Sequence, residues 1–194
     1  FSHCMTATHY HSVTSYHVFN RKAHMVKQLS KLESVSQPPL ASNAPREDDG
    51  LRDCKVSHEC GACQYIAEPY DAQLATKDAS MKALFTGDEF AHIELRPIIG
   101  MENPYHYRNK VHAAFALDQR RQIVSGVYQT GSHAVVPVES CLIEDETADR
   151  IVQDIRAMLR PFKIQVFDER SGTGWLRHVL IRRGFATGEV MVVL

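Results

Sequence analysis

Alternating apolar and polar positions predict an antiparallel meander in the middle of the chain. Within residues 105–117, one strand face carries Val111, Ala113, Phe115 and Leu117. Residues 118–122 then indicate a hairpin turn, residues 123–129 a returning strand, and residues 134–138 a third extended stretch. The predicted meander therefore ends just before Cys141.

Helical periodicity replaces this alternation in two stretches. Residues 145–162 predict a helix that Asp145 or Thr147 can cap, and its apolar stripe consists of Ile151, Ile155, Met158, Leu159 and Phe162. Residues 68–85 predict a second helix, because Pro69 suits a first turn and Gly87 suits a C-terminal stop.

Shorter extended segments complete the predicted fold at residues 90–99, 164–167, 175–183 and 188–194. Together the elements indicate an α/β chain of the α+β type. We expect a mainly antiparallel sheet with two flanking helices.

The first fifty residues differ in character from the rest. They contain five of the eleven histidines, and residues 36–45 have the proline- and serine-rich composition of a linker. We therefore expect residues 1–50 to be a poorly ordered tail and residues 51–194 to be a folded central domain. Because the chain begins at Phe1 and stops inside a predicted strand, we expect a fragment truncated at its C-terminal end.

Composition narrows the class of protein. The 194 residues are 44% hydrophobic, which suffices for one sizeable core. Lys and Arg number 22 against 23 Asp and Glu, so any contact with a nucleic acid must come from a local patch. No apolar run approaches the roughly 20 residues of a membrane span, and no secretory signal opens the chain. We expect a cytoplasmic protein without an obligate protein partner.

Three cysteines lie close together in a polar loop, and a fourth lies far downstream. Cys54, Cys60 and Cys63 form the pattern C-x5-C-x2-C, and Cys141 follows the meander. Four thiolates can close the shell of a metal ion or an iron–sulfur cluster. Structural zinc sites usually use two close pairs, so the three-plus-one spacing favours an iron–sulfur cluster and leaves its nuclearity open.

Three other interpretations of the cysteines remain. They are a zinc site, disulfides, and four reduced cysteines buried as small apolar side chains. Cys4 matches no motif, and we assign it no nucleophilic role.

Two basic clusters are candidate RNA contacts. The first is Arg108 and Lys110, which share a strand face with His112, and the second comprises Arg177, His178 and Arg182. If the two strands are neighbours, these cations and nearby aromatic residues suit phosphate contacts and base stacking on single-stranded RNA. The alternative is ordinary solvated charge on a sheet. No G-x-G-x-x-G or P-loop motif indicates a nucleotide cofactor.

Five motifs in order resemble the RNA uracil-5-methyltransferase family, in particular its iron–sulfur-containing members that act on 23S ribosomal RNA. The motifs are C-x5-C-G-x-C-Q at 54–64, Y-R-N-K-V at 107–111, G-x-Y-x-x-G-S-H-x-x-V-x-x-x-x-C at 126–141, G-x-L-R-H-x-x-x-R-R-G at 174–184 and T-G-E-V-M-V at 187–192. Each motif is weak alone, and the resemblance covers residues 54–194.

The resemblance implies a [4Fe–4S] cluster on Cys54, Cys60, Cys63 and Cys141 in an RNA-facing central domain. It implies that an S-adenosylmethionine-binding, Rossmann-like domain follows Leu194 and carries the catalytic cysteine and base. No catalytic residue is then expected in this chain. Ribosomal RNA is the implied partner, ahead of transfer RNA. The alternatives are an iron–sulfur or zinc RNA-binding module without catalysis, and an electron carrier of the ferredoxin type.

Overall fold

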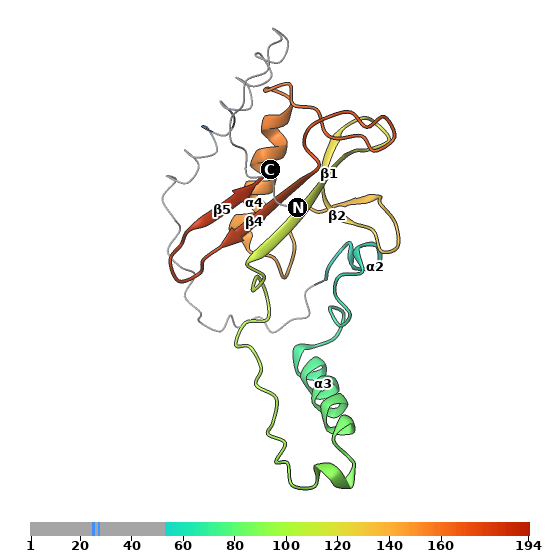
Figure 1. The fold of residues 1–194 in the computed structure, drawn as a ribbon, viewed down its shortest axis with the longest axis vertical. Coiled ribbons are helices and arrows are strands. Elements are labelled where there is room, and N and C mark those ends of the chain that lie inside the picture. The colour runs from blue at the N-terminus through green and yellow to red at the C-terminus, as the bar shows by residue number, and fades with distance from the viewer. Residues whose placement is uncertain (1–24, 26, 28–52) are drawn as a thin grey trace.

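A computed structural model describes residues 25, 27 and 53–194 of the chain. Its sheet has five strands in the order β3-β2-β1-β4-β5, and every neighbouring pair is antiparallel. The strands are β1 (Lys110–Leu117), β2 (Ile123–Tyr128), β3 (Val135–Pro137), β4 (His178–Arg183) and β5 (Val190–Val193). The predicted meander and the predominantly antiparallel sheet are confirmed (Figure 1).

Helix α4 (Glu146–Leu159) packs across β1, β2 and β4. Its Asp145 cap accepts a hydrogen bond from the Ala148 amide at 3.0 Å, which satisfies one of the free N–H groups of the first turn. Apolar residues of the helix meet the buried face of the sheet in one core, whose fully buried side chains include Ile155, Leu159, Val179 and Ile181. The predicted cap and apolar stripe therefore position α4 as expected.

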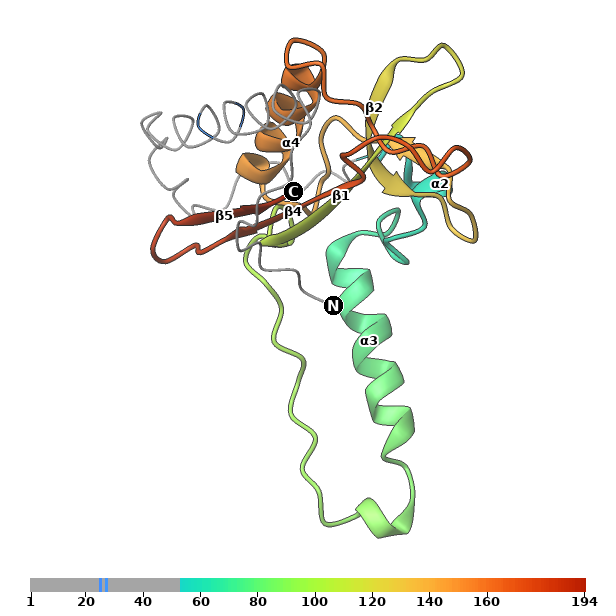
Figure 2. The same cartoon turned by 45° about the horizontal axis from the view of Figure 1, so that its top comes forward.

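Alternation along β1 divides the sheet into two faces. Val111, Ala113 and Phe115 are buried under α4, whereas Lys110 and His112 are exposed on the other side. We call the face opposite α4 the open face, and it carries Lys110, His112, Tyr128, His178 and Arg182. Figure 2 shows α4 on one side of the sheet and α3 running away on the other.

Helix α3 (Tyr70–Leu84) forms where the sequence predicted a helix, but it buries no residue. With the 3-10 turn η1 (Asp88–Phe90) and the return segment 91–109, it makes an arm that projects from the sheet (Figure 1). The Met101 amide donates to the Tyr70 hydroxyl at 2.8 Å, which ties the return segment to the helix. The expectation of two flanking helices is thus met by α4 alone, because α3 lies outside the core.

Two predicted strands are absent from the described part of the chain. Residues 90–99 belong to η1 and the return segment, and residues 164–167 make a single isolated bridge between Val166 and Leu176. Val166 and Leu176 are nevertheless buried in the core, so their apolar character reflects packing rather than strand pairing. A Cβ at Gly174 would lie 2.2 Å from the Val166 carbonyl oxygen, so this close approach requires glycine.

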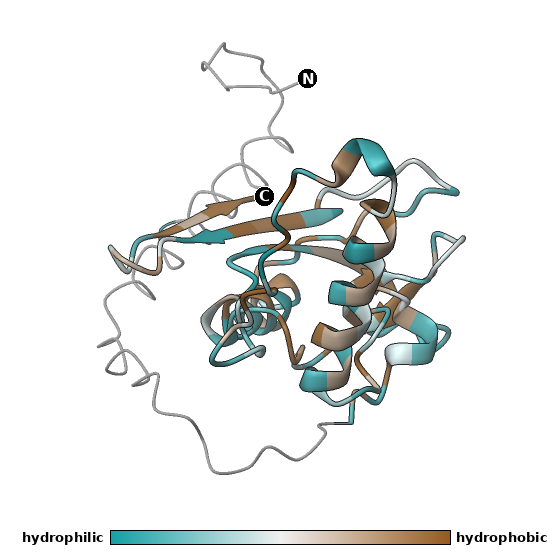
Figure 3. Cartoon of the chain, turned by 90° about the horizontal axis from the view of Figure 1, so that it is seen from below, coloured by the Kyte–Doolittle hydropathy of each residue, from teal (hydrophilic) through white to brown (hydrophobic). Residues whose placement is uncertain are grey.

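The edge strand β5 keeps apolar side chains in solvent. Met191 and Val193 are each 47% exposed. Figure 3 shows hydrophobic colouring along β5 toward the C-terminus. Among the described helices, none is long and apolar enough to cross a membrane.

The predicted tail at residues 1–50 lies outside the described residues, apart from Met25 and Lys27. Met25 is helical and fully buried in the same core as Ile155. Cys4 lies outside the described residues as well.

Candidate functional site

A short helix shapes the loop that carries the first three cysteines. Helix α2 (Ser57–Cys60) begins after Cys54, whose carbonyl accepts from the Ser57 amide at 3.1 Å. Gly61 ends the helix in the left-handed region with φ 62°, a conformation that L side chains rarely adopt. The turn therefore places Cys60 and Cys63 on either side of a required glycine.

The cysteine loop is held against the turn between β2 and β3. The Thr130 hydroxyl donates to the Cys60 carbonyl at 3.2 Å, and the Thr130 amide reaches the Glu59 carbonyl at 3.5 Å. A Cβ at Gly61 would lie 2.0 Å from the Thr130 hydroxyl oxygen. Glycine is thus needed at this position for space as well as for backbone conformation.

Cys141 lies between the end of the meander and the start of α4. Its amide donates to an Asp149 carboxylate oxygen at 2.8 Å. Burial raises the pKa of the Cys141 thiol to about 11, while hydrogen bonds from the amides of Ile143 and Glu144 oppose this rise. These amides favour the thiolate, which is the form that binds metals.

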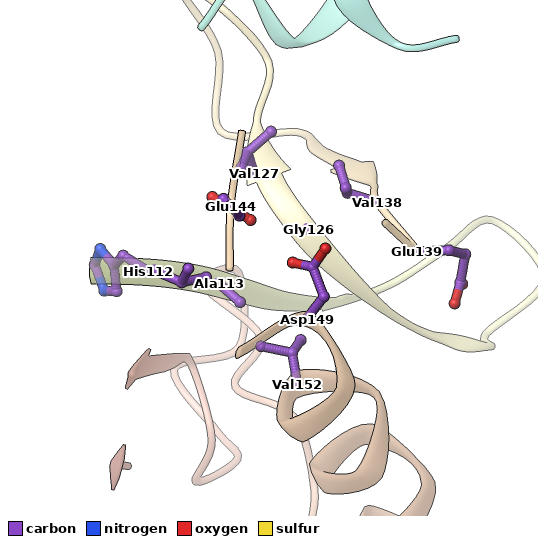
Figure 4. A pocket seen from close by; sticks show the side chains of 10 residues that line it. His112, Ala113, Gly126, Val127, Val138, Glu139, Glu144, Asp149 and Val152 are labelled. Atoms are coloured by element: carbon purple, nitrogen blue, oxygen red, sulfur yellow. The ribbon is translucent and has the colours of Figure 1, made fainter. Parts of the chain in front are cut away.

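A buried carboxyl group, Glu144, and a partly buried one, Asp149, lie beside Cys141. Burial raises the pKa of Glu144 to about 7, the neighbouring Asp149 raises it further, and Arg108 opposes both effects. Asp149 has a raised pKa too, mainly through burial. Figure 4 shows Glu144 and Asp149 lining a small pocket together with Val127, Val138 and Val152.

Arg108 belongs to this acidic neighbourhood. Its amide donates to the Ile143 carbonyl at 2.8 Å, and its carbonyl accepts from the Asp145 amide at 3.1 Å. Its guanidinium acts on Cys63 as well, because it lowers the pKa of that thiol, which burial chiefly raises. The predicted RNA contact Arg108 therefore lies between the cysteine loop and the Cys141 segment.

The chemistry of the four cysteines fits a sulfur-ligated group. All four are free thiols, which removes the disulfide interpretation for them, and each is only partly buried. The negative charges of Cys54, Cys60 and Glu144 raise the pKa of Cys63. The charge of Glu144 raises the pKa of Cys141 as well. Across residues 53–194, however, no three His, Cys, Asp or Glu side chains are gathered closely enough to hold a metal ion. Forming a four-thiolate shell requires these side chains to move closer together.

Lys110 and Arg182 form a like-charge pair on the open face. They are directly opposed in the β1–β4 register, and both are exposed. Like charges at such positions destabilise a sheet. None of the ion pairs found in the described part of the chain supplies an acidic partner for either residue.

His178 and Arg177 lie further along the same sheet. The Tyr128 hydroxyl is 2.8 Å from His178 Nε2, and burial, His112 and Arg177 lower the pKa of His178. Arg177 pairs with Glu169 and stacks over the Phe167 ring at 5.6 Å. Arg177 therefore already has an acidic partner.

The structure thus places the residues that were predicted to contact RNA in more than one location. Lys110, His178 and Arg182 share the open face, Arg177 lies beside it, and Arg108 lies at the cysteine site. Sequence reasoning missed Tyr128 and His133 as members of this surface, although both stand in the motif at 126–141. Their link to His178 depends on the β1–β2 and β1–β4 registers, which no motif reveals.

Comparison with known proteins finds relatives that are named RNA methyltransferases. No model of a known protein family matches it. An uncharacterised RNA methyltransferase from Enterococcus faecalis is 39% identical over 144 residues, which are 72% of this chain and 31% of that protein. One from Clostridium tetani is 34% identical over 141 residues, covering 73% of this chain and 30% of the relative. The chain thus spans about a third of the length of these relatives.

A solved structure shares the fold. It is the Pyrococcus abyssi tRNA (uracil-54, C5)-methyltransferase in complex with S-adenosyl-L-homocysteine. The TM-score is 0.51 at 22% identity, over 73% of this chain and 32% of the archaeal one. At this identity the likeness establishes the arrangement of the elements alone.

Proposed function

Because the chain belongs to the RNA methyltransferase family that these relatives represent, we propose that it is the RNA-recognising part of an S-adenosylmethionine-dependent RNA (uracil-C5)-methyltransferase. The preference for uracil C5 rests on the five ordered motifs in residues 54–194. The whole enzyme acts in the cytoplasm on 23S ribosomal RNA. The methyl-donor site and the catalytic cysteine belong to the two thirds of the relatives that this chain does not match.

The observation that carries RNA recognition is the like-charge pair of Lys110 and Arg182. Two opposed cations that have no acidic partner among the described residues cost stability, and a phosphate group would neutralise them. His178 and Arg177 lie further along the same sheet, where Glu169 offsets the charge of Arg177. We assign Arg108 to the cysteine site, because its charge lowers the pKa values of Cys63 and Glu144.

The proposal includes a [4Fe–4S] cluster on Cys54, Cys60, Cys63 and Cys141. The support is the three-plus-one spacing, the four free thiols and the two amides that favour the Cys141 thiolate. When bound, the cluster supplies iron–sulfur bonds that join the cysteine loop to the Cys141 segment. Its role is structural, and no electron transfer is required of it.

RNA binding by the 194-residue chain tests this function. We would measure filter binding of 23S ribosomal RNA and transfer RNA transcripts over a range of salt concentrations. Lys110→Ala and Arg182→Ala should each weaken binding and reduce the salt slope by about one phosphate contact. Arg96→Ala removes an exposed cation from the arm and serves as the matched control.

Two outcomes would contradict the proposal. If both open-face variants kept the affinity and salt slope of the Arg96→Ala control, the like-charge pair would have no role in RNA binding. If transfer RNA bound more tightly than 23S ribosomal RNA, the assignment of ribosomal RNA as substrate would be wrong.

A further inference from the structure

Four ring side chains form a continuous row along the open face. The ring centroids are 5.8 Å apart between His133 and Tyr128, 5.7 Å between Tyr128 and His178, and 4.8 Å between His178 and His112. The residues come from β1, β2, β4 and the turn after β2, so the row crosses three strands. We call these four residues the ring row.

The packing of the core does not account for the ring row. The core uses the other face of the same strands, where Val111, Val179 and Ile181 are buried beneath α4. His112 and His133 are exposed, and Tyr128 and His178 are partly exposed. A row of rings on the side of a sheet away from its helix thus presents π-faces and edges to solvent.

Hydrogen bonds hold part of the ring row in a fixed orientation. The Tyr128 hydroxyl pairs with His178 Nε2 at 2.8 Å, and His133 Nδ1 lies 3.1 Å from a Glu169 carboxylate oxygen. Arg177 pairs with the same carboxylate. Rings whose orientation is already fixed lose little freedom when a flat ligand stacks on them.

Cations lie at both ends of the ring row. Lys110 precedes His112 by two residues on the same face of β1, and Arg182 is directly opposite Lys110. At the other end, Glu169 offsets the charge of Arg177. The net positive end of the surface is therefore the one with Lys110 and Arg182, where a phosphate backbone is favoured.

We propose that the ring row is a stacking platform for the unpaired bases of single-stranded RNA, with the adjoining phosphates held by Lys110 and Arg182. This inference rests on the RNA-binding function proposed above and names the form of RNA that the open face takes. Aromatic and histidine rings on a sheet surface stack about two or three bases in other RNA-binding folds. A paired duplex conceals its base faces and would leave the ring row without a ligand.

Abasic RNA separates stacking from phosphate binding. We would measure fluorescence anisotropy of the 194-residue chain with a labelled single-stranded oligouridine and with an abasic oligomer of equal length. The base-bearing oligomer should bind about tenfold tighter or more. His112→Ala should reduce the ratio of the two affinities about fivefold, and it should leave the affinity for the abasic oligomer unchanged.

Two further variants complete the test. Tyr128→Phe keeps the ring and should retain most of the preference for the base-bearing oligomer. Tyr128→Leu removes the ring and should reduce this preference as much as His112→Ala does. His92→Ala removes an exposed histidine from the arm, outside the ring row, and should bind both oligomers as the unaltered chain does. Circular dichroism of each variant confirms that the sheet is intact.

The outcomes distinguish this inference from the function on which it rests. If the unaltered chain binds both oligomers equally, or His112→Ala weakens both equally, the stacking platform is overturned while RNA binding stands. If the unaltered chain binds neither oligomer nor any longer RNA, the proposed function fails as well.

Discussion

Arg108 and Lys110 are two residues apart, yet they belong to different sites. Arg108 is half-buried and held by backbone hydrogen bonds to Ile143 and Asp145, and its charge lowers the pKa values of Cys63 and Glu144. Lys110 is exposed opposite Arg182. The motif Y-R-N-K-V groups both cations, and only the structure separates their surroundings.

This separation predicts opposite effects of two substitutions. Arg108→Gln should reduce the iron bound per chain by about half or more, because it removes the cation that stabilises neighbouring thiolates. Lys110→Gln should leave the iron content unchanged and weaken RNA binding. Iron assay and filter binding on both variants provide the measurement, and a loss of RNA affinity alone in Arg108→Gln would return Arg108 to the RNA-binding face.

His178 gives the sheet a defined sensitivity to acid. Burial, His112 and Arg177 hold the pKa of His178 below its ordinary value of 6.5, so the folded chain binds fewer protons at this group than the unfolded chain. Its contribution to stability is therefore complete above about pH 6.5 and is lost as the pH falls below that value.

When the pH is lowered from 7.5 to 5.5, the free energy of unfolding should consequently fall less in the His178→Asn variant than in the unaltered chain. Urea unfolding at the two pH values measures the difference. The control His92→Asn, in the exposed arm, should keep the full loss. Equal losses in the His178 variant and the unaltered chain would show that this histidine titrates alike in both states.

At the scale of elements, Asp145 joins α4 to the sheet. One carboxylate oxygen caps the helix at the Ala148 amide, and the other accepts from Arg183 of β4 at 2.6 Å. Asp145 is 4% exposed, so its removal leaves Arg183 without its partner in a largely buried position.

Asp145→Ala should therefore lower the free energy of unfolding by about 1 kcal/mol for the cap and by up to about 3 kcal/mol more for Arg183. Denaturant unfolding measures the change. The neighbouring Glu146→Ala, whose side chain is mostly exposed, should cost only about 0.5 kcal/mol. Equal losses in the two variants would refute the dual role of Asp145.

The sequence predicted these elements where a periodicity extends over several turns or residues. The stripe of Ile151, Ile155 and Leu159 and the alternation of Val111, Ala113 and Phe115 place α4 and β1 correctly. Short apolar runs are less informative, because Val166 packs in the core without strand pairing. Helix α3 forms at the predicted place, but its moderate apolar pattern does not reveal that it lies outside the core.

At the scale of the molecule, two sites adjoin the same sheet. The cysteine loop rests on the β2–β3 turn through Thr130, and the Cys141 segment continues from β3 to the start of α4. The motif spacing predicts that Cys54, Cys60, Cys63 and Cys141 form a set, and this stays a prediction. It could not predict the ring row, since that surface depends on the registers that bring Tyr128, His178 and His112 together.

The central claim is that Cys54, Cys60, Cys63 and Cys141 hold a [4Fe–4S] cluster that joins the cysteine loop to the Cys141 segment. The most direct measurement is the iron, acid-labile sulfide and zinc content of anaerobically purified protein, with Cys141→Ser as the comparison. We predict about four irons and four sulfides per chain, with broad brown absorbance, and the loss of most of the iron in Cys141→Ser. About one zinc per chain without sulfide, or unchanged iron in Cys141→Ser, would contradict the claim.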